Sequence, residues 1–536
     1  MICWTRFVAI DKLLQIWQKR AIMTRLPATG TERHLFNRLD ISLGPEKQMS
    51  KILFVTAPYH CWGVQVVGTW PPLHLAYLAG AARDSGIEAR IFDAMNKKVS
   101  FNEIRKEIER YKPDYVMTLD YLPVTGAIST ATVPDCLKIL NIAKETDPAI
   151  VTLLGGPHPS FMYREIFEDE ANHVDYVLVG EPEQTLKQLL AALPEGTSKS
   201  VRGIAYRNGD QIVANGHQPH IADLDTLTPA WDLLDWDDYN YLVEPYGRMA
   251  SILTSRGCDM DCSFCSQRMY WREDWRCRKP EKVVAEMEYL ISSYQISFFT
   301  LIDPYPTKNR ERWELYLDLL IEKNLGVYLL IETRVEDIIR DADILHKYRE
   351  AGIIHVYLGA ESADKDVLNS LNKGTDFEQN KQALDLLREA GIITEASFMI
   401  GFPAETWESI QSTIDSAIYL NPDIAVFPVV TPMPFTPLFK DMKDCIRVFD
   451  YSKYNLVTPV VEPYKMTLAD ITKALGLCYM QFYSNKMQEI VALEDGFKRR
   501  YMLSAFMLMM KDHGASFDFD GADMSAMKMK MNLEIG

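Results

Sequence analysis

The sequence predicts an α/β protein with a doubly wound, Rossmann-like domain, then a partial (β/α) barrel of the TIM type, then a helical C-terminal region. Three observations support this class. Short β-rich and helical segments alternate over residues 49–195, a second alternating series occupies residues 251–440, and residues 441–536 are helical in pattern and end in a Met-rich tail. Strands that alternate with helices form parallel sheets, because each helix returns the chain to the end where the next strand starts.

The first domain is predicted over residues 49–195. Its expected strands are 51–59, 88–94, 114–120, 149–156 and 174–183, and its expected helices include 71–86, 101–111, 136–147 and 184–193. Residues 1–48 precede the first strand, which Met49 opens directly. We interpret them as an N-terminal extension, either poorly ordered or upstream of the true start.

Gly- and Pro-rich loops follow the strands of this first domain. They are expected over residues 63–72, 120–126, 155–162 and 180–183. In an open parallel sheet the ligand binds beyond the carboxyl ends of the strands, and glycine allows the backbone to approach a flat or phosphorylated ligand closely. The alternative, that each loop is only a tight turn between strand and helix, stays open.

Residues 196–250 are interpreted as a linker that contains a small hairpin turning at Asn208-Gly209. The barrel is predicted over residues 251–440. Its six expected strands are 250–257, 297–303, 327–334, 355–362, 395–402 and 423–434. Catalytic groups of such barrels lie at the carboxyl ends of the strands.

Composition limits the class of function. Of 536 residues, 47% are hydrophobic and 24% are charged, as in a globular protein of several domains. The formal net charge of −17 argues against nucleic-acid binding, which needs clustered Lys and Arg. No run of about 18 uncharged apolar residues predicts a membrane span. Nine cysteines, most of them scattered, predict a reducing compartment, and hence a cytoplasmic protein.

Three cysteines follow the first predicted barrel strand, with the spacing Cys258-x3-Cys262-x2-Cys265. A structural zinc site needs four Cys or His ligands, but no His lies between His220 and His346, and Cys277 is the one further thiol nearby. Three thiolates suit a 4Fe-4S cluster in which one iron stays open for a non-protein ligand. The sequence therefore favours an iron-sulfur site over zinc.

This cysteine motif, with Phe264 before its last cysteine, resembles the signature of the radical S-adenosylmethionine (SAM) enzymes. The resemblance implies reductive cleavage of SAM to methionine and a 5′-deoxyadenosyl radical. It also implies SAM contacts from Phe264 and from barrel strand ends: Asp303 near the methionine amine, Glu332, Arg334, Glu361, Ser362, and Gly401 beside the adenine. A strand-end polar residue without a special role is the alternative for each.

The N-terminal sheet resembles the cobalamin-binding domain found in one large class of these enzymes. It lacks the Asp-x-His-x-x-Gly motif that supplies a cobalt-ligating histidine elsewhere, and the lone His158 is an unpromising ligand. The resemblance implies that cobalamin contacts come from the Gly-rich loops: Gly68, Thr69, Trp70, Thr125, Gly155, Gly156, His158, Gly180 and Glu181.

Longer strings, including "RGCDMDCSFCSQRMYWR" and "VTPMPFTPLF", resemble the anaerobic magnesium-protoporphyrin IX monomethyl ester oxidative cyclases over residues 50–510. The resemblance implies oxygen-independent closure of the isocyclic ring of bacteriochlorophyll, with oxygen from water, a magnesium porphyrin as substrate, and an electron donor such as flavodoxin or ferredoxin. Aromatic side chains could stack on a macrocycle, and Tyr270, Trp271 and Phe435 are the candidates.

Two alternatives remain at this stage. One is a cobalamin-dependent radical SAM C-methyltransferase that acts on a tetrapyrrole or a related substrate. The other is a non-catalytic iron-sulfur or cobalamin-binding sensor. Departures from the family pattern at Thr69 and at Pro304-Tyr305 leave room for a paralogue with a different substrate.

Overall fold

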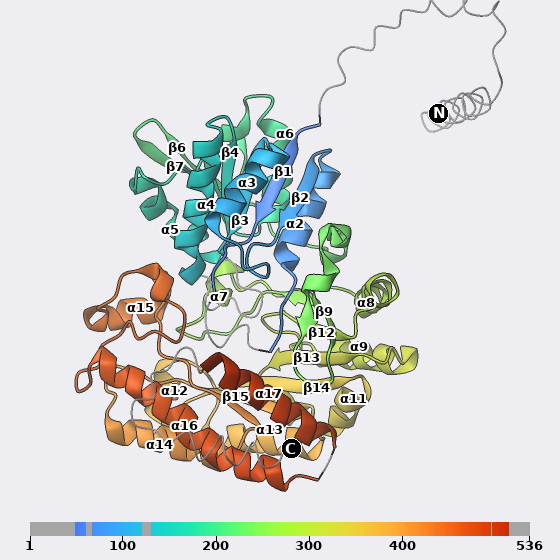
Figure 1. The fold of residues 1–536 in the computed structure, drawn as a ribbon, viewed down its shortest axis with the longest axis vertical. Coiled ribbons are helices and arrows are strands. Elements are labelled where there is room, and N and C mark those ends of the chain that lie inside the picture. Colours follow the sequence, from blue (N-terminus) through green and yellow to red (C-terminus); the bar gives the residue numbers. More distant parts are fainter. Residues whose placement is uncertain (1–48, 61–66, 121–129, 495, 514–536) are drawn as a thin grey trace, which may run out of the picture. The chain divides into compact units, whose positions relative to one another are not determined.

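A computed structural model describes residues 49–60, 67–120, 130–494 and 496–513 of the chain. Two seven-stranded sheets and a two-stranded ladder form its framework (Figure 1). The predicted class, a doubly wound domain followed by a partial barrel and a helical C-terminal region, is confirmed.

The first sheet has the strand order β2-β1-β3-β4-β5-β6-β7. Its parallel strands are β1 (Lys51–Val55), β2 (Glu88–Phe92), β3 (Tyr115–Leu119), β4 (Val151–Gly155) and β5 (Tyr176–Leu178). Helices α3 (Phe101–Tyr111), α4 (Val133–Thr146) and α5 (Pro157–Glu168) bury apolar side chains against one face. Helices α2 (Leu73–Asp84) and α6 (Pro182–Ala192) cover the other face, so the sheet is doubly wound.

The hairpin that we placed in a linker belongs to this sheet. Strands β6 (Ile204–Asn208) and β7 (Gln211–Ala214) are antiparallel, and β6 pairs with β5. Ile204 and Ala205 are fully buried, so the hairpin extends the first core beyond residue 195. The rest of the segment forms short 3₁₀ turns, from which Trp231, Trp236 and Tyr239 pack into the core of the second sheet.

The second sheet has the order β16-β15-β14-β13-β12-β9-β8 and curls into a half-barrel. Six strands are parallel, and β8 (Asn240–Tyr241) is antiparallel to its neighbour. The parallel strands are β9 (Gly247–Ile252), β12 (Phe298–Leu301), β13 (Tyr328–Thr333), β14 (Ile353–Glu361), β15 (Ile393–Phe398) and β16 (Ile424–Val426).

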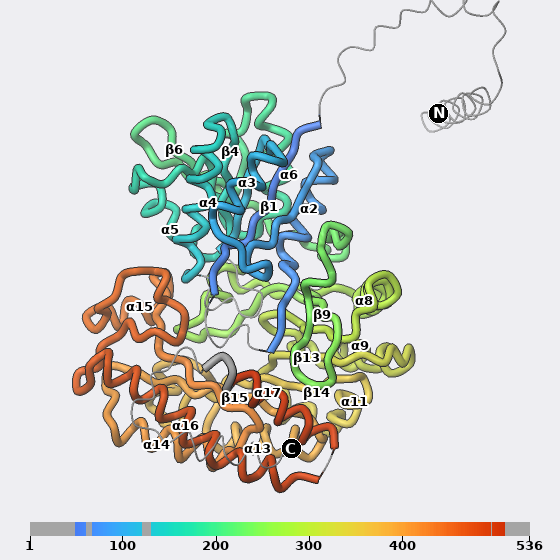
Figure 2. The backbone as a smooth tube through the Cα atoms, viewed as in Figure 1, coloured from blue at the N-terminus to red at the C-terminus, as the bar shows by residue number. Residues whose placement is uncertain are grey.

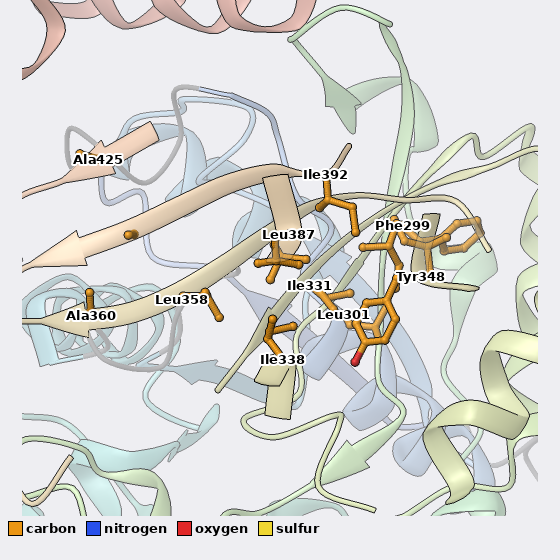
Figure 3. Packing of buried hydrophobic residues seen from close by; sticks show 14 of the residues in the cluster. Phe299, Leu301, Ile331, Ile338, Tyr348, Leu358, Ala360, Leu387, Ile392 and Ala425 are labelled. Atoms are coloured by element: carbon orange, nitrogen blue, oxygen red, sulfur yellow. The ribbon is translucent and has the colours of Figure 1, made fainter. Parts of the chain in front are cut away.

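The helices that follow these strands and cover one face of the half-barrel are α8 (Pro280–Tyr294), α9 (Arg310–Lys323), α10 (Val335–Arg340), α11 (Leu345–Glu350), α13 (Phe377–Glu389) and α14 (Trp407–Leu420). The short helix α12 (Lys365–Ser370) packs instead with the segment after β16. Figure 3 shows part of the resulting core, in which Ile331 and Leu358 of the strands lie among Ile338 and Leu387 of the helices.

Helix α17 (Phe497–His513) of the C-terminal region covers the other face of the half-barrel. It packs Tyr501, Met502 and Ala505 against side chains of β9, β12, β14 and β15, and Figure 2 shows it, in red, beside β14 and β15. Helix α16 (Leu468–Ala492) packs against α14, and α15 (Pro437–Met442) precedes a stretch with only short 3₁₀ turns in its described residues.

None of the helices in the described ranges combines the length and apolar character that a membrane crossing requires.

Two leucines of helix α9, one buried and one exposed, allow the packing of this core to be tested. Leu317 is fully buried, whereas Leu315, two residues away, is 43% exposed. We expect Leu317→Ala to lower the free energy of unfolding by about 2–5 kcal/mol, because it leaves a cavity. Leu315→Ala should change it by less than about 0.5 kcal/mol. Chemical denaturation of both variants checks the difference, and equal losses would contradict this packing.

Candidate active site

The three cysteines lie on a loop that begins and ends in a short ladder. Strands β10 (Ser255–Arg256) and β11 (Arg276–Cys277) are antiparallel and hold the loop of residues 257–275, which we call the cluster loop. Helix α7 (Gln267–Tyr270) follows the third cysteine and lies between the two sheets in Figure 1. The first barrel strand and this ladder therefore fix both ends of the loop.

One cavity joins the cluster loop to the strand ends of both sheets. The half-barrel contributes residues at the carboxyl ends of β12, β13 and β14, and the first sheet contributes residues that follow β3, β4 and β5. The lining includes Cys258, Cys262, Cys265, Phe264, Asp303, Glu332, Arg334, Glu361 and Lys373 on one side, and Asp120, Gly156 and Glu183 on the other. Both fold classes place ligands at such ends.

The thiols suit an iron-sulfur cluster. Burial raises the pKa of Cys258, and it raises that of Cys265 to about 12, so these thiols need a bound metal to become thiolates. In the described ranges no three His, Cys, Asp or Glu side chains are grouped around a position for a single metal ion. A cluster instead takes each thiolate on a different iron, and the three cysteines share one cavity wall.

Asp303 holds the strand that leads into the cluster loop. Its side chain is buried and accepts hydrogen bonds from the Thr254 amide (2.7 Å), the Ser255 hydroxyl (2.9 Å) and the Thr254 hydroxyl. Burial raises the pKa of its carboxyl group. Asp303 lines the cavity, and these contacts give it a structural role at the start of the cluster loop; its contact with the methionine amine stays a prediction.

Glu361 and Lys373 form a buried ion pair at the end of β14. The Lys373 ammonium donates to Glu361 at 2.7 Å and lies 5.8 Å from the centroid of the Phe264 ring. Ser397 donates to the other carboxylate oxygen of Glu361 at 3.0 Å. Glu361 and Phe264 were predicted from the sequence, but Lys373 was not, because it lies between α12 and α13 and not at a strand end.

Arg334 adds a second cation to this wall. Its guanidinium donates to Glu336 at 2.6 Å and to the Lys373 carbonyl at 3.0 Å. Burial and the adjoining Glu336 carboxylate act on the guanidinium in opposite directions, and its pKa is raised. Arg334 and Lys373 thus place two cations on the cavity wall beside the thiols and the Phe264 ring, and each cation is paired with a protein carboxylate.

Two predicted SAM residues do not line the cavity. Ser362 accepts from the Asp364 amide at 3.0 Å and begins the turn into α12. Gly401 has φ +91°, and its amide donates to Glu405 at 2.8 Å. Both therefore support the loops that follow β14 and β15, and neither faces the cavity directly.

Glu332 makes the stability of the folded protein depend on pH. Its side chain is open to the cavity, and desolvation together with Glu395 raises its pKa from 4.5 to about 8, while Lys373 opposes the shift. Because the folded pKa exceeds the unfolded value, ionising Glu332 costs stability increasingly as pH rises from 4.5 to 8.

We therefore expect Glu332→Gln to raise the Tm of the ligand-free protein above wild type. The difference should be absent below pH 4.5 and should grow up to about pH 8. Thermal unfolding over this pH range checks it, with the exposed Glu378→Gln as a control. A difference independent of pH would contradict the environment described for Glu332.

The predicted loop of residues 155–162 is largely helical. Gly155 ends β4, and α5 begins at Pro157, because proline suits the first helical position. Gly156 has φ +108°, and a Cβ there would lie 1.6 Å from an Asp120 carboxylate oxygen. The His158 amide donates to the other oxygen of Asp120 at 2.7 Å, so glycine is required for this packing.

His158 is a buried core histidine. Its Nδ1 lies 3.2 Å from the Thr130 hydroxyl, and its ring packs edge-on against Phe435 and Tyr451. Burial lowers its pKa to about 3. It does not line the cavity, and neither does Gly155.

Residues 68–70 lie away from the predicted edge. Thr69 pairs with the backbone of Asn240, and Gly68 forms a bridge with Tyr241, so this stretch runs along β8 of the second sheet. Trp70 is 4% exposed and packs with Tyr241 and Met249. The cavity lining does not include them. Thr125 lies outside the described residues.

The loop between β5 and α6 contacts the cluster loop. Gly180 accepts a hydrogen bond from the Tyr270 hydroxyl at 2.8 Å, and Glu181 pairs with Arg256 at 2.7 Å and with Arg276 at 3.0 Å. Glu183, the last residue of the predicted loop 180–183 but not one of the predicted cobalamin contacts, pairs with Arg256 at 2.6 Å. Gly180 and Glu181 thus lie behind the cavity wall, and Glu183 lies in it.

The aromatic candidates divide into two groups. Tyr270 and Trp271 line the cavity, and their rings meet edge-on at 4.9 Å. Phe435 lies outside the lining and stacks on Phe161 of α5 at 4.9 Å, which joins the segment after β16 to the first domain.

Comparison with known proteins divides the chain in the same way. Residues 59–190 match the B12 binding domain, and residues 252–417 match the radical SAM superfamily. The chain is 39% identical to the anaerobic magnesium-protoporphyrin IX monomethyl ester cyclase of Rubrivivax gelatinosus, over 86% of this chain and 82% of that one. It is 38% identical to the enzyme of the same name from Cereibacter sphaeroides, over 86% and 75%.

More distant similarities lead to methyltransferases. An uncharacterized methyltransferase of Pyrococcus horikoshii is 31% identical over 81% of this chain and 93% of its own. Among solved structures, the radical SAM methyltransferase TsrM from Kitasatospora setae, with cobalamin and a 4Fe-4S cluster bound, superposes with a TM-score of 0.64. That match has 15% identity and covers 87% of this chain and 100% of TsrM, so it supports the fold alone. The predicted radical SAM and cobalamin-binding domains are confirmed.

Proposed function

The chain belongs to the family of anaerobic magnesium-protoporphyrin IX monomethyl ester cyclases, and on that premise we propose that it is an oxygen-independent radical SAM oxidative cyclase. It forms the isocyclic ring of its magnesium porphyrin in (bacterio)chlorophyll synthesis. The observation that carries the proposal is a single cavity in which three cysteine thiols face the strand ends of two sheets.

Cys258, Cys262 and Cys265 hold the 4Fe-4S cluster in this proposal. When bound, the cluster supplies the electron that cleaves SAM and yields the radical that abstracts hydrogen from substrate. Arg334 and Lys373 provide positive charge for the SAM carboxylate, and Phe264 flanks it. Asp303, Glu332 and Glu361 line the same wall. Ser362 and Gly401 do not line it, and they form hydrogen bonds within the loops that follow β14 and β15.

Cobalamin is assigned to the first-sheet side of the cavity. Asp120, Gly156 and Glu183 line it at the carboxyl ends of β3, β4 and β5, where open α/β sheets bind ligands. Tyr270 and Trp271 line the same cavity between the two sheets and offer aromatic surface to a flat macrocycle. A flavodoxin or ferredoxin supplies electrons in the cytoplasm.

The test is an anaerobic incubation of reconstituted protein with reductant, SAM, cobalamin and magnesium-protoporphyrin IX monomethyl ester. We expect 5′-deoxyadenosine and a porphyrin that has gained one oxygen and lost hydrogen. Recovery of unchanged porphyrin from protein that cleaves SAM would overturn the assigned substrate.

The similarity to methyltransferases favours one second candidate, a cobalamin-dependent radical SAM C-methyltransferase on a tetrapyrrole or related scaffold. The same incubation distinguishes it, because methyl transfer adds one CH₂ unit to the product and no oxygen.

A further inference from the structure

The loop between β5 and α6 meets the base of the cluster loop through buried charges. Arg256 is 1% exposed and donates to Glu181 at 2.7 Å and to Glu183 at 2.6 Å, and both carboxylate side chains are 3% exposed. Arg256 and Arg276 are register partners in the ladder that closes the cluster loop. The two carboxylates therefore neutralise the two arginines at the residues where the cluster loop begins and ends.

The two glutamates differ in what their oxygens contact. One Glu181 oxygen accepts from Arg256, and the other accepts from the Ile221 amide at 2.7 Å and from Arg276 at 3.0 Å. One Glu183 oxygen, Oε1, accepts from Arg256. Its second oxygen, Oε2, is buried and has no hydrogen-bond partner among the described residues, although Glu183 lines the cavity.

A buried carboxylate oxygen without a partner is costly, and it is usually satisfied by a ligand, an ion or water. Glu183 lies on the first-sheet side of the cavity, where the proposed function assigns cobalamin. The corrin rim carries primary amide side chains, whose N–H groups are suitable donors to a carboxylate. A donor at Oε2 would also polarise the carboxylate that holds Arg256.

We propose that Glu183 Oε2 accepts a hydrogen bond from a corrin amide. Through the ion pair between Glu183 and Arg256, cobalamin binding then affects the position of the cluster loop. This inference rests on the proposed cofactors but not on the porphyrin substrate. Glu183 is then a cobalamin-binding residue, and Arg256 is a positioning residue, two positions before the first cysteine.

The test measures two properties of anaerobically reconstituted protein, neither of which is catalytic activity. Titration with hydroxocobalamin gives its Kd, and the EPR spectrum of the reduced cluster is recorded with and without saturating cobalamin. We expect cobalamin to shift the cluster spectrum of the wild type. Glu183→Gln should bind cobalamin at least about tenfold more weakly, through loss of a charge-assisted hydrogen bond, and should show a smaller spectral shift at saturation.

Two further variants complete the test. Glu286→Gln breaks a comparably buried pair with Arg278, at 2.5 Å, within the half-barrel side of the molecule, and should leave both readouts at wild-type values. Tyr270→Phe is a second test: it removes the hydrogen bond that joins α7 of the cluster loop to the Gly180 carbonyl but keeps the ring, and it should reduce the spectral shift at saturating cobalamin. It also keeps the coupling testable if Glu183→Gln fails to fold.

Two outcomes would overturn the inference. One is a Kd of Glu183→Gln equal to that of the wild type at equal iron content. The other is a cluster spectrum that cobalamin leaves unchanged in the wild type. Failure of the porphyrin assay alone would affect only the proposed function, because neither readout contains substrate.

Discussion

Replacing Cys258, Cys262 or Cys265 by Ala abolishes the iron-sulfur absorption of anaerobically reconstituted protein and stops the release of 5′-deoxyadenosine. This is the largest effect we expect from any single substitution. In the proposed site each of these thiolates is a ligand of the cluster, and in the described structure no other thiol lines the cavity. Absorption spectra, iron and sulfide content, and 5′-deoxyadenosine yield with a chemical reductant measure it.

Cys277→Ala is the matched control. Cys277 lies in β11 at the end of the cluster loop but is exposed and does not line the cavity. It should retain full cluster content and SAM cleavage. Zinc as the sole metal, or full cluster content in a Cys262→Ala variant, would contradict the assignment of the ligands.

Gly257→Ala should prevent cluster assembly almost as completely. Gly257 immediately precedes Cys258, has φ +95°, and its added Cβ would lie 1.9 Å from the Asp274 carbonyl oxygen. Because that atom belongs to the backbone of the opposite end of the cluster loop, the loop must open to accommodate a methyl group. We expect a large fall in iron content, measured after reconstitution.

Gly391→Ala separates this clash from backbone strain. Gly391 also has a positive φ, +72°, but a Cβ there would meet nothing within 4 Å. It should cost only about 1–2 kcal/mol of stability from the left-handed conformation and leave iron content unchanged. Equal iron loss in the two variants would show that positive φ alone, and not the contact with Asp274, governs cluster assembly.

Local sequence patterns were sufficient to predict the framework. The alternation of strand and helix patterns located the parallel strands of both sheets. The hairpin 204–214 was assigned to a linker because sequence cannot tell which edge an antiparallel hairpin joins. Its pairing with β5 depends on tertiary packing of Ile204 and Ala205.

The site was predictable only where a residue's role follows from local position. The cysteines, Asp303, Glu332, Arg334 and Glu361 lie at or after strand ends, and all line the cavity. Lys373 reaches the cavity from the segment between α12 and α13, so spacing gave no indication of it. Glu183 belongs to the predicted loop 180–183, but it was not among the residues predicted to contact cobalamin.

Residues 68–70 were predicted to contact a ligand but do not line the cavity. A Gly-rich segment after β1 suggested a ligand loop, but Trp70 carries more apolar surface than an exposed loop can leave in water. It is buried against Tyr241 and Met249, and this burial draws the segment onto β8.

The most direct test of the central claim is the mass of the porphyrin product formed in ¹⁸O-labelled water without dioxygen. The protein, with cluster, SAM, cobalamin and reductant, should convert magnesium-protoporphyrin IX monomethyl ester into a product that carries one ¹⁸O atom and fewer hydrogens. A product that gains a CH₂ unit and no ¹⁸O would contradict the cyclase assignment and establish methyl transfer.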